Sequence, residues 1–211
     1  SQSMLGVFRG MNKKANLYDL QHGLIYENHE SYMQNKDVNL NIKNNNVKLL
    51  LMGRGFKDLL VNDYYKKNAF VIGSEIFVQE NQKSLNNINK VLVTLQFTED
   101  HSFQFNQKLL NDLNIFFTQV EDHGINIQFY LKHHPRFRKE ISLEPLNKFS
   151  FVKFSENTTL EELLKKCNFH LTAYSTTVFE AALNGVPTFF YNYDKSFIFH
   201  DNFSYPITSE I

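Results

Sequence analysis

Hydrophobic and polar residues alternate along the second half of the chain in a pattern typical of a parallel α/β sheet. Between two strand-like runs, apolar residues recur at helical spacing from Phe105 to Val120, and Gly124 follows as a helix stop. Strands that alternate with helices predict right-handed crossovers, and hence a Rossmann-like parallel sheet with helices on both faces. Short apolar runs predict the buried strands of this sheet at residues 91–95, 127–131, 149–154, 169–173 and 186–191.

Two shorter helices are predicted later in the chain. Thr158 and Glu161 have the spacing of a capping box in front of an apolar run. Ser175 stands where it can cap a helix over residues 176–184, which Gly185 ends. Both helices would connect neighbouring strands of the same sheet.

The first half repeats the strand and helix pattern on a smaller scale. A helix is predicted over residues 56–65, and strands are predicted at residues 16–20, 47–52 and 69–72. Asn- and Lys-rich stretches without periodicity predict loops at residues 34–48 and 79–90. We therefore expect the end of a preceding domain, a small α/β linking segment and a Rossmann-like domain, at residues 1–46, 47–85 and 86–211.

Composition narrows the class of protein. Lys and Arg number 22 and so do Asp and Glu, which argues against a nucleic-acid partner held by a general basic field. Cys167 is the single cysteine, and we expect a small buried residue there. No apolar stretch approaches the roughly 20 residues of a membrane span, and no signal peptide is recognisable. A cytoplasmic setting fits these features.

The strongest candidate site is the turn that begins with Ser175. An apolar strand leads into it, and Thr176 and Thr177 open the next helix. A helix start offers free backbone N–H groups to an anion. Glu180 lies about 7.5 Å further along the helix axis, a spacing that suits one group on a phosphate and the other on a ribose. Taken alone, Ser175 is an ordinary N-cap.

A second candidate site follows the strand at residues 127–131. Pro135 fixes the backbone and orients His134, and Lys132 supplies a nearby cation. Adjacent side chains of an extended segment point to opposite sides, so only one of His133 and His134 should face a ligand. As a two-residue motif, His-Pro alone is more often an ordinary loop.

Candidate acid–base residues occur in two further places. Gly23 allows a tight turn after Gln21 and His22, and His22 or the nearby Glu27 could take up a proton. Glu99 follows the strand predicted at residues 91–95. Taken alone, the Gln21–Gly23 segment is more simply a strand-end turn with solvated side chains, and Glu99 with Asp100 is more often a solvated pair at a helix start. No Asp-x-Asp motif, P-loop or Gly-x-Gly-x-x-Gly fingerprint is present, so the sequence supports neither a metal site nor a bound cofactor.

The order of these motifs resembles bacterial surface-polysaccharide glycosyltransferases of the two-Rossmann-domain (GT-B) type. Capsule Kdo-transferase-like, sialyltransferase-like and teichoic-acid glycerophosphotransferase-like enzymes carry similar motifs. The resemblance covers most of residues 17–194. It rests on Gln21-His22-Gly23, Met52-Gly53, Val71-Ile72-Gly73, His134-Pro135, Tyr174-Ser175-Thr176-Thr177 and Gly185-Val186-Pro187.

The resemblance implies a role for each motif. The histidine and the hydroxyl turn would hold the phosphate of a nucleotide donor, and Glu180 would hold its ribose. Lys132, Pro135 and Thr177 would flank the donor. The Gln21–Gly23 segment and Glu99 would line a cleft, with His22 or Glu27 as the catalytic base. Most of the first Rossmann domain of such enzymes is missing, so we expect this chain to be incomplete as an enzyme.

The expected function is metal-independent transfer of a sugar from a CMP- or CDP-linked donor to a polysaccharide or glycolipid acceptor. Regions outside this chain would allow association with the inner face of the membrane. Three alternatives stay open: a polyol-phosphate (CDP-glycerol-type) transferase, a nucleotide-sugar 2-epimerase-like isomerase, and a non-catalytic nucleotide-binding module. If the turns are only helix caps, no nucleotide would bind at all.

Overall fold

The computed structural model describes residues 2–26, 29–34, 37–73, 89–192, 199–201 and 203. The chain divides into two compact units, Ser1–Glu75 and Ile76–Ile211.

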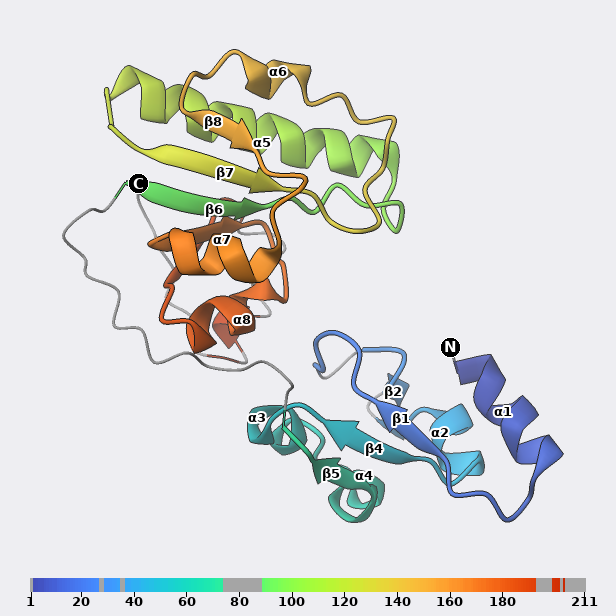
Figure 1. The fold of residues 1–211 in the computed structure, drawn as a ribbon. Helices are drawn as coiled ribbons and strands as arrows, with labels where there is room; N and C mark the ends of the chain where they lie inside the picture. Colours follow the sequence, from blue (N-terminus) through green and yellow to red (C-terminus); the bar gives the residue numbers. More distant parts are fainter. Residues whose placement is uncertain are drawn as a thin grey trace. The chain divides into compact units, whose positions relative to one another are not determined.

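The second unit contains a five-stranded parallel sheet (Figure 1). Its strands are hydrogen-bonded in the order β10-β9-β6-β7-β8. Each strand falls within or beside an apolar run that the sequence predicts, which confirms the predicted parallel α/β sheet. The strands are β6 (Lys90–Thr94), β7 (Gln128–Lys132), β8 (Val152–Phe154), β9 (Phe169–Thr172) and β10 (Thr188–Phe190).

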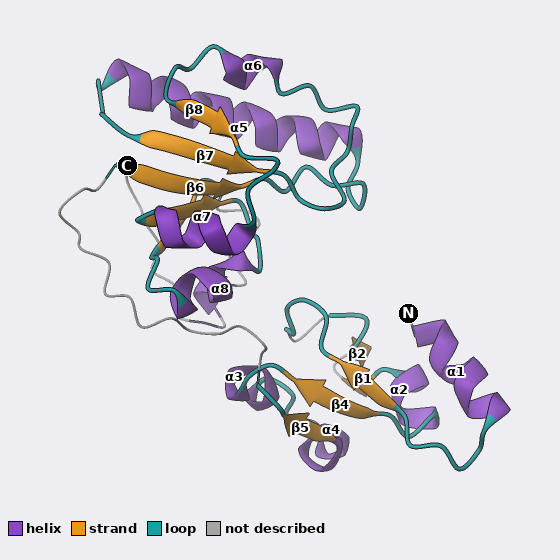
Figure 2. Ribbon diagram, viewed as in Figure 1, coloured by secondary structure: helices purple, strands orange, loops and turns teal. Residues whose placement is uncertain are grey.

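Helices cover both faces of this sheet (Figure 2). On one side lie α5 (Phe103–Asp122) and α6 (Glu144–Asn147), and on the other lie α7 (Leu160–Lys166) and α8 (Thr177–Leu183). Successive residues of β6 point to opposite faces. Val91 and Val93 therefore pack in a core cluster with α5, whereas Leu92 packs in a second cluster with α7 and α8.

Local signals set the ends of these helices, with one correction. Ser102 caps α5 by accepting a hydrogen bond from the backbone N–H of Phe105, and Gly124 follows the helix at φ 59°. The capping box of α7 is formed by Thr159 and Glu162, one residue later than predicted. Thr159 has the extended backbone that a cap needs and accepts from the Glu162 N–H, so the prediction at Thr158 was wrong in register.

The first unit holds a smaller parallel sheet in the order β1-β4-β5 and an antiparallel pair, β2 and β3. The strands are β1 (Tyr18–Leu20), β2 (Met33–Gln34), β3 (Asp37–Val38), β4 (Lys48–Leu51) and β5 (Ala69–Val71). The helices are α1 (Gln2–Met11), α2 (Leu40–Asn44), α3 (Arg54–Asp58) and α4 (Asp63–Asn68). Strands β1 and β4, from either side of residue 46, pair within one sheet. The division of the chain at residues 46 and 85 stays a prediction.

Asparagines explain two wrong predictions in this unit. The helix predicted over residues 56–65 is broken into α3 and α4, because the Asn62 side chain accepts a hydrogen bond from the Tyr64 N–H and starts a new helix. Part of the loop predicted over residues 34–48 is α2, which Asn39 caps and which buries Ile42. Asparagine is depleted in helix interiors yet favoured at helix starts. The second predicted loop, 79–90, lies outside the described residues up to residue 88.

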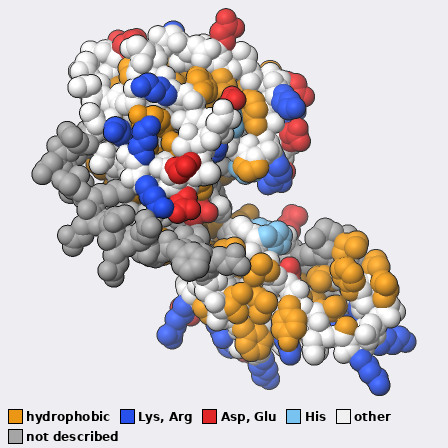
Figure 3. Space-filling model, in the orientation of Figure 1, with side chains coloured by type: hydrophobic (Ala, Val, Ile, Leu, Met, Phe, Trp, Pro, Cys, Tyr) orange, Lys and Arg blue, Asp and Glu red, His pale blue; other side chains and the backbone are white. Residues whose placement is uncertain are grey.

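One face of the smaller sheet is open to solvent. Leu49 and Leu51 of β4 are buried, whereas Leu20 of β1 and Phe70 of β5 are 56% and 44% exposed. Apolar side chains gather over β4, β5 and α1 on the face of this unit shown in Figure 3. No described helix is long and apolar enough to cross a membrane.

Candidate functional site

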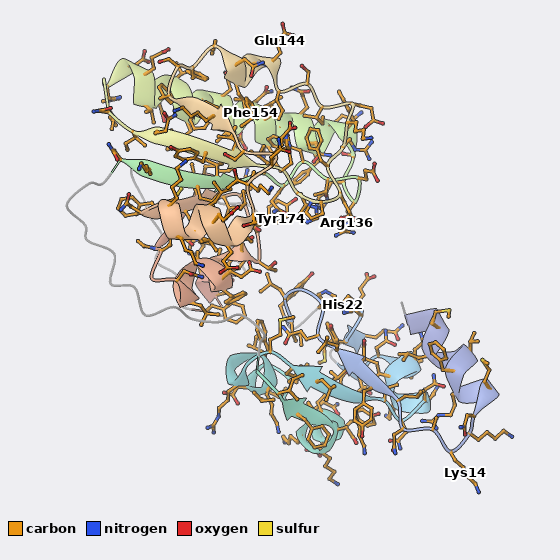
Figure 4. All side chains as sticks on the ribbon, in the orientation of Figure 1. Lys14, His22, Arg136, Glu144, Phe154 and Tyr174 are labelled. Carbon is orange, nitrogen blue, oxygen red and sulfur yellow. The ribbon has the colours of Figure 1, made fainter. Side chains whose placement is uncertain are left out.

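The larger sheet reverses its direction of winding between β6 and β9. From β6 the chain proceeds outward through β7 to β8, and then returns to place β9 on the other side of β6. Ligands of open α/β sheets bind beyond the carboxyl ends of the strands at such a switch point. The loops after β6, β7 and β9 therefore frame the candidate site, and Figure 4 shows Arg136 and Tyr174 at this edge.

The loops after β6 and β7 are joined along their length. The Arg138 N–H donates to the Phe97 carbonyl at 2.9 Å, and the Glu99 N–H donates to the Arg136 carbonyl at 3.2 Å. These two loops form the rim of the candidate site, and an ion pair of 2.7 Å between Arg136 and Asp100 joins them there. Glu99 is exposed on this rim, so its carboxylate is accessible to solvent.

One ring nitrogen of His134 accepts a hydrogen bond from the backbone. The backbone N–H of Arg136 donates to His134 Nδ1 at 3.0 Å. A nitrogen that accepts a hydrogen bond carries no proton, so neutral His134 has its proton on Nε2. Burial lowers the pKa of His134, and the charge of Arg136 lowers it further while Asp100 raises it. His134 therefore offers an Nε2–H donor at the end of β7, behind the turn at Pro135.

His133 points elsewhere. Its ring packs against Phe137 and Phe154, with centroids 4.2 and 6.2 Å away, and the side chain is 20% exposed. His133 Nε2 lies 3.7 Å from Glu156 Oε1, and burial lowers the pKa of this histidine. With α6 and β8 it lines a surface pocket of about 590 Å³. The two neighbouring histidines thus have different surroundings.

Lys132 is occupied by backbone carbonyls. Its ammonium donates to the carbonyl oxygens of Ser155, Glu156 and Thr158, at 3.3, 2.9 and 2.7 Å. An ammonium has three N–H groups, and these three contacts use all of them. In this arrangement Lys132 ties the end of β7 to the loop before α7. Its predicted contact with a donor stays a prediction.

The hydroxyls of the turn after β9 bond to each other. Ser175 Oγ accepts from the Thr177 N–H at 3.2 Å and donates to Thr177 Oγ1 at 2.9 Å. The Ser175 N–H donates to Thr172 Oγ1 at 3.3 Å. Ser175 and Thr177 are buried, 6% and 8% exposed. The residue directly before α8 is Thr176, one later than the predicted cap, and it makes no side-chain cap bond. Ser175 instead accepts from the first N–H of the helix, and its hydroxyl proton is already bonded to Thr177.

Thr176 and Glu180 differ from their neighbours in this turn. Thr176 is exposed, and no described residue bonds to its hydroxyl. Glu180 is half-buried within α8, and burial raises the pKa of its carboxyl while a hydrogen bond from Thr177 lowers it. Of the predicted turn residues, Thr176 and Glu180 are those with groups available to a ligand.

Below the turn lies a histidine that the sequence analysis did not single out. His170 is fully buried in β9, with Nε2 2.8 Å from Thr94 Oγ1 in β6 and Nδ1 3.0 Å from Thr188 Oγ1 in β10. Burial lowers its pKa to about 3. His170 therefore links three strands as a neutral imidazole. A histidine inside an apolar strand, flanked by strands that carry threonine, is the signal that would have found it.

In the first unit, the predicted Gln21–Gly23 segment forms a turn at the end of β1. Gln21 is 2% exposed; its Nε2 donates to the Gly23 carbonyl and its Oε1 accepts from the Met52 N–H, each at 2.9 Å. Gly23 has φ 78°, a left-handed backbone that favours glycine. Gln21 thus joins the ends of β1 and β4 instead of facing solvent.

His22 belongs to an aromatic cluster with Tyr26, His29 and Tyr32. Its Nδ1 lies 2.7 Å from the Tyr32 hydroxyl, which also accepts from the His22 N–H at 3.0 Å. The His29 ring lies 6.5 Å from that of His22, and burial lowers the pKa of His29. Glu27, the second predicted base, lies outside the described residues. Tyr32 carried no sequence signal, because its contact with His22 is created only by the fold.

Among the described residues, no three His, Cys, Asp or Glu side chains gather as a metal-binding group would. The polar side chains that follow β7 and β9 at the switch point include the His134 imidazole and the exposed hydroxyl of Thr176.

Comparison of the sequence with protein-family models and with curated proteins finds no match. Among solved structures, TarM is similar with a TM-score of 0.53 and 14% identity, over 88% of this chain and 39% of TarM. The glycosyltransferase SnogD from Streptomyces nogalater has a TM-score of 0.38 at 14% identity, over 74% of this chain and 43% of SnogD. The glycotransferase of kitacinnamycin has a TM-score of 0.39 at 14% identity, over 67% and 35%.

The chain spans less than half the length of each of these proteins. The likeness to TarM concerns the fold. It confirms the predicted fold class: the chain has the mixed α/β architecture of the GT-B type, with a five-stranded parallel sheet flanked by helices.

Proposed function

We propose that the chain is the donor-binding part of a glycosyltransferase that moves a sugar from a nucleotide-activated donor to a polysaccharide or glycolipid acceptor. The enzyme would work in the cytoplasm, at the inner face of the membrane where such acceptors are held. The observation that carries the proposal is the position of His134 and the Ser175 turn. Both follow strands that end at the switch point of a Rossmann-ordered sheet.

Different residues of the site would have different tasks. The Nε2–H of His134 and the free hydroxyl of Thr176 would donate to the donor phosphate. Ser175 would act indirectly, by fixing Thr177 and the start of α8. Glu180 would accept from a ribose hydroxyl, as carboxylates do in dinucleotide-binding folds.

The proposed chemistry is displacement at the sugar carbon with a nucleotide phosphate as the leaving group. Negative charge grows on that phosphate as the bond breaks, and donors fixed in advance stabilise it without reorganising. In this proposal the fixed donors take the part that a metal ion has in other transferases. Turnover should then be unchanged when EDTA replaces added Mg²⁺.

Binding of nucleotides to the chain tests the proposal directly. CMP, CDP and UDP at saturation should raise the unfolding temperature, since ligand at 100 times its Kd adds about 2.7 kcal/mol to stability. Calorimetry should then show that Thr176→Val weakens binding at least about tenfold, since a hydrogen bond to a charged group is worth roughly 1.5–3 kcal/mol. Ser150→Ala, in an exposed turn before β8, is the matched control.

The outcomes separate this proposal from the others. Absence of stabilisation by every nucleotide would refute a donor site here and leave the turns as helix caps. With the full-length enzyme, a product formed from donor alone would indicate an isomerase, and a transferred polyol phosphate would indicate a glycerophosphotransferase-type reaction. A nucleotide that binds and is never turned over would identify a non-catalytic module.

A further inference from the structure

Tyr32 is fixed from several directions. Its side chain is fully buried, and its backbone N–H donates to the His29 carbonyl at 2.8 Å. Its carbonyl accepts from the Asn39 N–H at 3.0 Å and from the hydroxyl of Tyr65, which is also buried. The ring therefore cannot shift without disturbing the core of the first unit. Its phenol reaches out from this rigid support to His22 at the end of β1.

The hydrogen-bond partners of the Tyr32 hydroxyl determine where its proton lies. A phenol has one proton to donate and also accepts hydrogen bonds. Tyr32 Oη accepts from the His22 backbone N–H at 3.0 Å, because an amide N–H is always a donor. Its remaining contact among the described residues is His22 Nδ1 at 2.7 Å. Among the described residues, the phenolic proton therefore has one acceptor, and that acceptor is Nδ1.

The opposite arrangement is disfavoured. If Nδ1 carried the proton, the phenol would accept twice and its own buried proton would have no partner. A buried donor without an acceptor shifts such an equilibrium by about tenfold or more. Neutral His22 thus keeps Nδ1 bare and its proton on Nε2, and its side chain is exposed at the edge of the first sheet. His134 has the same pattern, with Nδ1 accepting from a backbone N–H.

We propose that Tyr32 is a positioning residue that holds His22 as the Nε2–H tautomer, so that His22 meets a substrate as a hydrogen-bond donor and not as a base. The meaning of this for chemistry rests on the proposed function, whereas the tautomer does not. The substrate group that His22 recognises would be a hydrogen-bond acceptor, such as a phosphate or sugar oxygen. The saccharide or glycolipid that receives the sugar would lose its hydroxyl proton to another residue.

Two-bond ¹H–¹⁵N NMR correlations distinguish the two tautomers of a neutral imidazole. In this chain, which has eight histidines, the signals of His22 are those missing from His22→Gln. At neutral pH we expect Nε2 protonated and Nδ1 bare in the unmodified chain. In Tyr32→Phe the ratio of the two tautomers should fall by about tenfold. Tyr26→Phe, which alters the same cluster without touching His22 Nδ1, should leave the ratio unchanged.

The unmodified chain decides the tautomer even if Tyr32→Phe fails to fold. A proton on Nδ1 of neutral His22 would overturn the proposal. For the donor role, turnover of the full-length enzyme is compared for His22→Gln and His22→Ala. Glutamine can donate from nearly the position of Nε2 but cannot act as a base, so it should retain at least about fivefold more turnover than alanine.

Equal loss in both variants would overturn the donor role and favour a base. Full turnover in both, together with the expected NMR result, would instead remove His22 from the site and contradict the proposed function at that residue. The tautomer and the function can therefore fail separately.

Discussion

Replacement of His170 by glutamine tests whether the buried imidazole in β9, the strand that leads into the Ser175 turn, is held neutral by the fold. His170 is fully buried between Thr94 and Thr188, and no charged partner is among its contacts. Burial lowers its pKa from 6.5 to about 3. In the unfolded chain the same histidine would take up a proton near pH 6.5. The folded and unfolded states therefore bind different numbers of protons between these two values.

The sign and size of the effect follow from this difference. Below pH 6.5 the unfolded state binds a proton that the folded state excludes until about pH 3, so stability falls as the pH falls through this window. Each pH unit is worth 1.36 kcal/mol, so the 1.5 units from 6.5 down to pH 5 remove about 2 kcal/mol. Above pH 6.5 both states are neutral at this residue and the effect vanishes.

The assay is denaturant unfolding at pH 7 and pH 5, followed by circular dichroism and assigned to the second unit. The other histidines with lowered pKa values, His29, His133 and His134, add a change of the same sign, so the comparison between variants isolates His170. His170→Gln should be less stable at pH 7 but should lose about 2 kcal/mol less than the unmodified chain on going to pH 5. His123→Gln, exposed at the end of α5, should follow the unmodified chain. An equal loss in the unmodified chain and in His170→Gln would refute the reasoning.

Three further changes probe other parts of the second unit. His134→Ala should weaken donor binding or turnover of the full-length enzyme at least about tenfold, since a hydrogen bond to a charged phosphate is worth roughly 1.5–3 kcal/mol, and unchanged kinetics would reject the assignment. Asn106→Ala should lower the free energy of unfolding by about 2–4 kcal/mol, because the buried amide bonds both the N–H and the carbonyl of Thr98, and chemical denaturation measures the loss. Thr159→Ala should cost about 1 kcal/mol by removing the cap of α7, with Thr158→Ala as the neighbouring control that leaves stability unchanged.

The sequence predicted most of the larger sheet because its signals are local. Each strand is a short apolar run, and α5 has a clear apolar face with a serine cap and a glycine stop. Helix α6 was missed, since its four residues carry too little periodicity to recognise. In the first unit, asparagines that cap helices looked like loop residues. Local patterns therefore failed where one residue type serves two structural purposes.

The sequence predicted that the candidate residues lie at strand ends, but it did not predict their hydrogen bonds. The turn at Ser175 and the segment at His134 both lie at strand ends, as expected for a ligand site in such a sheet. What Lys132 and Ser175 do is decided by partners far away in the chain or by bonds within the turn. The contact of Tyr32 with His22 needs the whole first unit to form. No pattern of residue types carries that information.

The hydrogen bonds of His134, at the end of β7, and of His29, in the loop before β2, bear on where a catalytic base can be. His134 accepts a backbone N–H at Nδ1, and so does His29 from Ser31 at 3.2 Å. A neutral imidazole with Nδ1 so occupied presents a proton at Nε2, which suits it to stabilise a phosphate that gains negative charge and not to remove a proton. By the same reasoning the proposed tautomer of His22 makes a third donor. The proton of the acceptor hydroxyl would then pass to a carboxylate. We expect that carboxylate to be Glu27, Glu99 or a residue of another part of the full-length enzyme. If it is Glu27 or Glu99, the isosteric change of that residue to glutamine should abolish turnover while nucleotide binding persists; turnover that survives both changes would exclude both residues as the base.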